Sequence, residues 1–284
     1  MEWERAKNII LIAFIFLNLG LAGLLYLEDS RYTLTPDRIR NMHTVLSNNN
    51  IILYTNPMRR FAPMRHLDIT GYYYDIPEIL NIFFGDEPVY QYETEEGHPK
   101  YETANAENGS LEISNGYIYF DNHLQNDIIE EIPRTVAVGT SDAFINEHFP
   151  DFVRDIVFEE YGGVHIIYCQ EYRGQLIQSN VIEFFITSQG IEWIEMRYGR
   201  VIGYDAEPRM IFAPDEILLT FMQRVRHEAA ENRIFIRDID IVYLQEFVSD
   251  QEGSVYPAIP FYRIFVQHSD FPFLINAYTN EFLD

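Results

Sequence analysis

The longest apolar pattern in the chain lies close to its start, where residues 9–27 carry no charged side chain. A helix that rises about 1.5 Å per residue spans roughly 28 Å over such a run, close to the ~30 Å hydrocarbon core of a bilayer. The alternative is a cleaved export signal, whose apolar region usually has only about 7–15 residues before a site of small residues. Gly20 and Ala22 resemble such a site, but the apolar run continues beyond them. The pattern therefore predicts a retained transmembrane helix at residues 9–27.

The residues before this run predict its orientation. Arg5 and Lys7 lie just ahead of the apolar residues, and Trp3 precedes both. Lys and Arg favour the cytoplasmic side of a membrane, and tryptophan is enriched at the membrane interface. We therefore expect residues 1–8 to be cytoplasmic and residues 28–284 to be extracytoplasmic. The predicted localisation is the cell membrane, with one span in contact with lipid.

The first predicted exterior region, residues 28–139, mixes short helices with strands. Thr35 as a cap and Pro36 at the first position indicate a helix that ends at Asn48 or within the next two residues. Further elements are a strand at 51–55, a helix at 75–85 and alternating strands at 88–123 with a tight turn at Asn115 and Gly116. The polar and acidic residues 93–109 are interpreted as a loop.

The second predicted region, residues 140–284, is more regular. It begins with a helix at 141–163, kinked or divided at Pro150, and holds another helix at 213–232. Extended runs follow at 164–174, 179–190 and 191–204 after the first helix, and at 233–248, 259–269 and 271–283 after the second. We therefore expect an α+β fold: an N-terminal transmembrane helix, then antiparallel sheets packed with helices, with two similar helix-plus-three-strand units in the second region.

The charge of the chain restricts its partners. The formal net charge is −24 and belongs to residues 28–284, because the acidic and basic residues before the apolar run cancel. Such a surface repels phosphate backbones, so the chain is expected not to bind nucleic acid. Among so many carboxylates, Asp238 and Asp240 carry little signal, since their alternation with isoleucine is typical of a half-exposed strand.

No combination of residues in the sequence predicts catalysis. His227 and Glu228 begin a segment similar to a zinc-protease helix, but Glu231 replaces the second histidine, which favours a solvated helix face. Cys169 and His165 lie four residues apart on a predicted strand, a poor spacing for a nucleophile and its base. We expect a protein that is not an enzyme and that holds no cofactor or metal.

Several segments resemble the YycI family. The start of the chain is similar to it: Met1, Glu2 and Trp3, then Arg5 and Lys7, then an apolar run that reaches Asn18. Residues 168–191 resemble the exterior strands of the family. Residues 259–283 resemble them too, and are similar to the related YycH and PepSY-like units.

This resemblance implies a regulatory function. Members of the family are single-span accessory proteins of the WalK/WalR two-component system in low-GC Gram-positive bacteria, which controls cell-wall metabolism. The chain is accordingly expected to modulate a WalK-like sensor histidine kinase together with a YycH-like partner, through both the span and the exterior region. The alternative is a membrane-anchored PepSY-like binding module that inhibits or chaperones a cell-wall hydrolase or protease. A wall-active enzyme is a third possibility, disfavoured by the absence of a catalytic pattern.

The apolar run also contains candidate partner contacts. At about 100° per residue, Asn18 shares a helix face with Ala22, while Ala13, Gly20 and Gly23 gather on roughly the opposite face. Small residues let helices approach closely, and an amide within a membrane can find a hydrogen-bond partner on another helix. The pattern predicts two contact faces between partner spans; the alternative is a simple tether in which Asn18 is tolerated.

Overall fold

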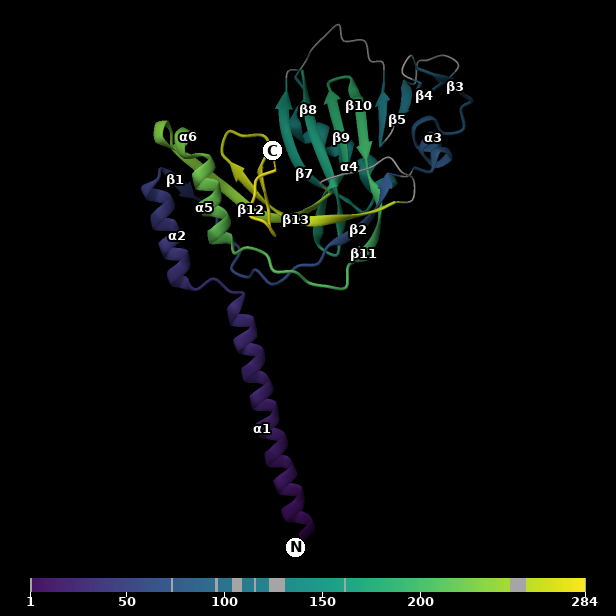
Figure 1. Cartoon of the computed structure of the whole chain (residues 1–284). Helices are drawn as coiled ribbons and strands as arrows, with labels where there is room; N and C mark the ends of the chain where they lie inside the picture. The colour runs from purple at the N-terminus through teal and green to yellow at the C-terminus, as the bar shows by residue number, and fades with distance from the viewer. Residues whose placement is uncertain are drawn as a thin grey trace.

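A single long helix, α1 (Glu2–Arg31), projects from a mixed α+β body built on one large sheet (Figure 1). The computed structural model describes residues 2–72, 74–94, 97–103, 109–114, 116–122, 131–160, 162–245 and 254–283. The remaining helices are α2 (Pro36–Asn48), α3 (Ile76–Phe84), α4 (Arg134–His148), α5 (Pro214–Arg224) and α6 (Arg226–Glu231). The strands are β1 (Ile51–Leu53), β2 (Leu67–Tyr72), β3 (Val89–Glu93), β4 (Pro99–Thr103), β5 (Ser110–Ser114), β6 (Tyr117–Asp121), β7 (Phe152–Glu160), β8 (Gly163–Tyr172), β9 (Gln175–Thr187), β10 (Gly190–Arg197), β11 (Gly199–Tyr204), β12 (Ile234–Leu244), β13 (Val255–Val266) and β14 (Phe273–Asn276). The α+β class predicted from the sequence is therefore confirmed.

Two lobes share the sheet. In the described residues the strand order is β11-β2-β13-β12-β9-β10-β6-β5-β4-β3, with β8 also beside β9, β7 beside β8, β1 beside β12 and β14 beside β13. The first lobe consists of α3, α4 and the antiparallel strands β3–β10. The second lobe consists of α2, α5, α6, β1 and β12–β14. Strands β2 and β11 continue the sheet from β13.

Each lobe has its own apolar core. In the first lobe, Ala137 and Ile145 of α4 and Ile79 of α3 pack against sheet residues such as Ile166 and Phe184. The core of the second lobe joins residues from α2, β1, α5, β12 and β13: Met42, Leu46, Ile51, Ile217, Phe221, Ile236 and Ile264. Helices α2 and α5 lie side by side over this sheet (Figure 1). Arg38 of α2 ties them together by donating from Nε and Nη2 to Asp215 of α5 at 2.8 and 2.6 Å.

The lobes meet where β9 runs parallel to β12. Tyr243 pairs with Ile177 at this point, and both side chains are buried in a small cluster with Leu67, Ile69 and Ala258. The long strand β9 pairs with β8 from Gln175 to Thr187, and with β10 from Val181 onward. One continuous sheet therefore contributes to two apolar cores, and the β9–β12 pairing connects the two lobes.

The early helix boundaries confirm the sequence predictions. Thr35 caps α2, where its Oγ1 accepts a hydrogen bond from the Arg38 amide at 3.3 Å, and Pro36 is the first helical residue. Asp75 caps α3 in the same way through the Glu78 amide, and Gly85 follows its end with φ +59°. These signals are local and therefore legible in the sequence.

The helix predicted at residues 141–163 is wrong over its second half. Helix α4 begins earlier, at Arg134, and ends at His148, two residues before Pro150. Residues 152–160 form β7 instead, which pairs with β8 from Phe152↔Gln170 to Glu160↔Gly163. Proline supplies no amide for a helix, and the β-branched and aromatic residues that follow it suit a strand. Residues 140–204 therefore contain five strands, β7–β11, where three were predicted.

Further predictions need correction. The helix predicted at 213–232 divides into α5 and α6, and the strand predicted at 271–283 is limited to β14. Residues 99–103, which the polar composition assigned to a loop, form β4 between β3 and β5; residues 95, 96 and 104–108 of that loop lie outside the described part. The run at 191–204 divides into β10 and β11 because the chain leaves the first lobe at Gly199. A Cβ there would lie 2.2 Å from the carbonyl oxygen of Thr70, so only glycine allows this approach to β2.

Other predicted details lie at the edge of the described residues. Strands β5 and β6 pair across the predicted turn, from Ser114↔Tyr117, and Gly116 has φ +98°, whereas Asn115 itself lies outside the described part. The end of the predicted strand at 233–248, from residue 246 onward, also lies outside it.

Candidate functional site

The residues predicted to contact the membrane or partner spans all lie on α1, away from both lobes (Figure 1). Trp3 is 81% exposed and Lys7 is also exposed, whereas the side chain of Arg5 lies outside the described part. The predicted partner contacts are exposed as well: Ala13, Asn18, Gly20, Ala22 and Gly23. The structure thus places them along one helix and brings none of them to the body.

Asn18 already makes one hydrogen bond within α1. Its Nδ2 donates to the carbonyl oxygen of Phe14 at 2.8 Å. An asparagine amide has two N–H donors and an accepting oxygen, so one donor and the oxygen remain for a partner. An added Cβ at Gly20 or Gly23 meets no atom within 4 Å, which leaves both positions open for a neighbouring helix.

The large apolar side chains of α1 are uncovered. Ile10, Phe14 and Phe16 are 69%, 62% and 70% exposed. Within the side chains that the structure describes, no helix is both long enough and apolar enough to cross a membrane. Ile9 and residues 25–27 of the uncharged run are not among those side chains. The transmembrane assignment of residues 9–27 stays a prediction.

A second candidate site lies between the lobes, around a buried arginine that the sequence analysis did not single out. Arg263 of β13 is only 1% exposed. It donates from Nε and Nη2 to Asp240, its direct cross-strand partner on β12, at 2.8 and 2.6 Å. Its Nη1 donates to Oδ2 of Asp155 on β7, in the other lobe. The guanidinium therefore links three strands and two lobes.

Burial and the two carboxylates act in opposite directions on Arg263. Burial alone lowers the pKa of the guanidinium, but the hydrogen bonds to Asp240 and Asp155 outweigh it and raise the pKa above its ordinary value. The group is thus firmly charged. A buried charge of this kind is tolerated only when it is paired and hydrogen-bonded, which this one is.

Cys169 belongs to the same cluster. Its Sγ donates to Oδ2 of Asp155 at 3.4 Å, and burial, with the neighbouring carboxylate, raises the pKa of the thiol well above its ordinary value. A thiolate nucleophile requires the opposite shift. His165 does not approach this thiol; its ring stacks on Phe158 and contacts Glu160 and Glu183. Cys169 is a packing residue here.

Two β-bulges aim charged side chains at the space above this cluster. The β7–β8 register shifts between Arg154 and Ile156, which leaves Asp155 as the extra residue. The β12–β13 register shifts between Ile236 and Asp238, which leaves Arg237 as the extra residue of β12. Bulges redirect side chains and are frequent next to functional sites.

The space itself is a cleft of about 460 Å³. Its floor includes Arg263, Asp155 and Asp240, and its rim carries further charged or polar residues: Arg134, Arg237, Asp238, His268, Ser269 and Asp270. Arg134 is the first residue of α4, and its Nη2 donates to the carbonyl oxygen of Val157 at 3.2 Å. Arg237 donates from Nη2 to the carbonyl oxygen of Ser269 at 3.3 Å. One guanidinium therefore stands on each wall. We call this space the seam cleft.

The seam cleft is hard to predict from the sequence. The alternation of Asp238 and Asp240 with isoleucine correctly indicates a strand. It does not reveal that Asp240 pairs with Arg263 of the neighbouring strand. The one visible signal is Arg263, a charge within the apolar run of residues 259–266. Its partner Asp155 lies 108 positions earlier, so this pairing cannot be predicted from the sequence alone.

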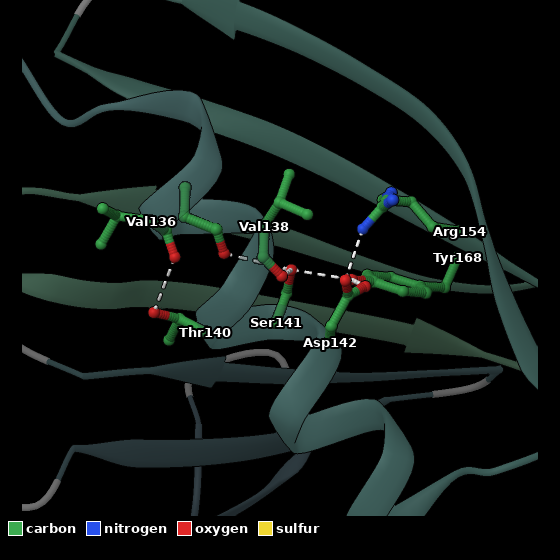
Figure 2. A network of polar contacts seen from close by, with 8 residues as sticks. Val136, Val138, Thr140, Ser141, Asp142, Arg154 and Tyr168 are labelled. Carbon is green, nitrogen blue, oxygen red and sulfur yellow. Dashed lines mark hydrogen bonds and ion pairs between the residues drawn. The ribbon is translucent and has the colours of Figure 1, made fainter.

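A separate polar network holds helix α4 against the strands of the first lobe (Figure 2). The hydroxyl of Tyr168 on β8 donates to Oδ1 of Asp142 at 2.6 Å and meets Oγ of Ser141 at 2.8 Å. Arg154 of β7 pairs with Oδ2 of the same aspartate at 2.5 Å. Burial and the Asp142 hydrogen bond raise the pKa of Tyr168, so the hydroxyl stays protonated as a donor. This network holds a helix in place and offers no reactive group.

The described residues also bear on metal binding. They contain no group of three or more His, Cys, Asp or Glu side chains that could hold a metal ion. His227 and Glu228 of the zinc-protease-like segment lie exposed on the short helix α6.

Comparison with known proteins shows similarity of fold only. No protein-family model and no curated protein matches the chain. The crystal structure of an uncharacterised protein from Eubacterium rectale is similar with a TM-score of 0.54 and 8% identity, over 83% of this chain and 91% of that one. The C-terminal domain of YpeB from Bacillus megaterium is a structural neighbour with a TM-score of 0.44 and 9% identity, over 76% of this chain and 99% of that domain. At such identities the first similarity shows a shared α+β fold, and the resemblance to YycI stays a prediction.

Proposed function

We propose that the chain is a non-enzymatic, single-pass membrane regulator, anchored by α1 and acting through protein contacts. The observation that supports it most is the isolation of α1: its large apolar side chains are mostly exposed, at 49% or more, and the helix stands apart from both lobes. A helix that is apolar on every side needs either lipid or other helices around it. The uncharged run at residues 9–27 has the length that lipid requires.

The identity of the partners rests on the resemblance to YycI. In this proposal a WalK-like sensor histidine kinase and a YycH-like protein contact the span and the exterior body. Asn18 and the small residues Gly20 and Gly23 would face these partner spans, with the remaining Asn18 donor available for an interhelical hydrogen bond. The two lobes would lie outside the membrane.

A topology experiment tests the anchor. A reporter fused after Asp284 is expected to be active only on the outer side of the membrane, and the mature protein is expected to retain Trp3. Mass spectrometry of the purified protein identifies its N-terminus. A mature chain that begins near Gly23 would show a cleaved signal and would overturn the proposal.

The second candidate is an anchored PepSY-like binding module that inhibits or chaperones a cell-wall hydrolase or protease. The seam cleft favours it, because a polar cleft in the exterior body is suited to engaging a partner outside the membrane. Co-purification from detergent-solubilised membranes separates the two. A sensor kinase recovered with the wild-type chain supports the first function, and a wall hydrolase or protease in its place supports the second.

A further inference from the structure

The seam cleft contains charges that do not neutralise one another. Arg134 and Arg237 hydrogen-bond to backbone carbonyl oxygens and have no carboxylate within ion-pair distance among the described residues. Asp238 accepts from the Ile239 amide at 2.8 Å and from the Thr55 hydroxyl at 3.5 Å. Asp270 has no hydrogen-bond or ion-pair partner in the described part of the chain. In a chain with 44 acidic residues, two guanidinium groups without a carboxylate partner in one cleft are notable.

The floor offers one more hydrogen-bond acceptor. The side chain of Asp155 is 6% exposed, and both of its hydrogen bonds, from Arg263 and from Cys169, fall on Oδ2. Its Oδ1 therefore has no donor among the described residues. This oxygen is not among the fully buried polar atoms that lack a partner in the described residues, so it keeps some access to the cleft. A ligand with an N–H group would satisfy this oxygen.

The arrangement restricts the ligand's chemistry. Arginine binds carboxylates through two parallel hydrogen bonds, so Arg134 and Arg237 favour a carboxylate. Asp155, Asp238 and Asp270 favour an ammonium group and repel a second negative charge. Complementary charges of both signs select a ligand that is itself zwitterionic. The cleft volume of about 460 Å³ lies within the roughly 300–1,000 Å³ of typical ligand sites.

We propose that the seam cleft binds a short peptide that carries a free amino group and a free carboxylate. Arg134 and Arg237 hold the carboxylate, while Asp270, Asp238 and Oδ1 of Asp155 receive the amino group. Arg134 belongs to the first lobe and Arg237 to the second, so the bound peptide bridges the two lobes. The proposal does not depend on which protein α1 contacts.

The test uses the full-length chain in detergent micelles and three probes: trialanine, N-acetyl-trialanine and trialanine amide. Isothermal titration calorimetry is expected to show that trialanine binds. Removing either terminal charge is expected to weaken binding at least tenfold, the loss that corresponds to about 1.4 kcal/mol. No binding of trialanine at about 10 mM, where a millimolar ligand saturates its site, would overturn the proposal.

Variants then assign each end of the peptide. Arg134→Gln and Arg237→Gln are expected to weaken trialanine binding about tenfold but to leave the amide unaffected, because the amide lacks the carboxylate. Asp270→Asn is expected to weaken trialanine but not the N-acetylated probe. These three side chains are exposed, so folding is expected to be retained, which circular dichroism checks. Arg200→Gln, also exposed and outside the cleft, is the matched control. The proposal would be overturned if Arg200→Gln lost as much affinity for trialanine as the cleft variants. It would also be overturned if the loss in each variant were the same for the free and the blocked peptides.

Discussion

At the scale of single residues, Arg263 is the side chain on which the junction between the lobes depends. It is the largest of the almost fully buried side chains in the described residues, and its charge is balanced by Asp240 from its own lobe and by Asp155 from the other. A buried pair contributes little net stability when it is intact, but breaking it strands a charge in the interior. The stability lost on substitution of Arg263 should therefore depend on whether the charges of Asp155 and Asp240 remain.

Arg263→Leu is expected to lower the free energy of unfolding by about 3–5 kcal/mol, because it leaves the buried Asp155 without its cation. Adding Asp155→Asn and Asp240→Asn should restore a large part of that loss, since no buried charge then remains. Urea unfolding followed by tryptophan fluorescence measures both values. A single variant as stable as the wild type would show that the ion cluster is not buried in solution.

Tyr168→Phe removes only the hydroxyl that joins β8 to α4 (Figure 2). Ser141 keeps its bond to the Ala137 carbonyl oxygen and Asp142 keeps Arg154, so we expect a loss of about 1–2 kcal/mol in the free energy of unfolding. Thr140→Ala on the same helix is the control, because the exposed Thr140 hydroxyl bonds only to Val136 of its own helix and its removal should change stability by less than about 0.5 kcal/mol. Equal losses in the two variants would contradict the role assigned to Tyr168.

At the scale of elements, α1 is separate from the elements of the body. Asn18→Leu is expected to weaken co-purification of the full-length chain with a sensor kinase several-fold without abolishing it, because an interhelical hydrogen bond contributes only about 0.6–2 kcal/mol. Gly20→Ile with Gly23→Ile should act on the other face and add roughly independently. Unchanged recovery and unchanged kinase output in both variants would show that α1 is only a tether.

Comparison of the predicted with the observed elements shows which parts of the fold can be read from the sequence. The start of α2 was predicted at Pro36, and α3 was predicted to within one residue at each end. Both starts have local causes, because Thr35 and Asp75 cap the helices through bonds that span three residues. Strand β7 has local signals against a helix, Pro150 and the β-branched residues that follow it, but the hydrogen bonds that make it a strand come from β8, further along the chain. The seam cleft was missed for the same reason, since a bulge at Asp155 or Arg237 exists only relative to a partner strand. Local signals were legible, and those created by register were not.

At the scale of the whole molecule, buried tyrosines determine how the fold responds to alkali. Burial raises the pKa of Tyr198 from 10.0 to about 12, and the nearby Glu78 carboxylate adds to this shift. Burial also raises the pKa of Tyr278 to about 12. The unfolded chain therefore loses these protons at a lower pH than the folded chain does. The stability they contribute is complete below pH 10 and declines between pH 10 and about 12.

The expected decline is up to about 1.4 kcal/mol per pH unit for Tyr198, and less for the more exposed Tyr278, whose charge is partly screened by solvent. Urea unfolding of the full chain at a series of pH values measures it. Tyr198→Phe, which keeps the ring contacts with Phe149 and Phe152, should make the slope shallower. Stability that stays constant through this range would show that these hydroxyls are not buried in solution.

The pairing of β1 with β12 has a consequence for the order in which the protein is made. Arg38 of α2 meets Asp215 of α5 177 positions later, and Ile51 of β1 meets Ile234 of β12. Because a chain is synthesised from its N-terminus, the segment next to α1 waits for most of translation before its partners exist, while the first lobe between them can already collapse. A chain that stopped before α5 would keep α1 and the first lobe, but α2 and β1 would lack α5 and β12, which pack against them in the full chain. Premature termination would thus leave uncovered apolar surface immediately next to α1.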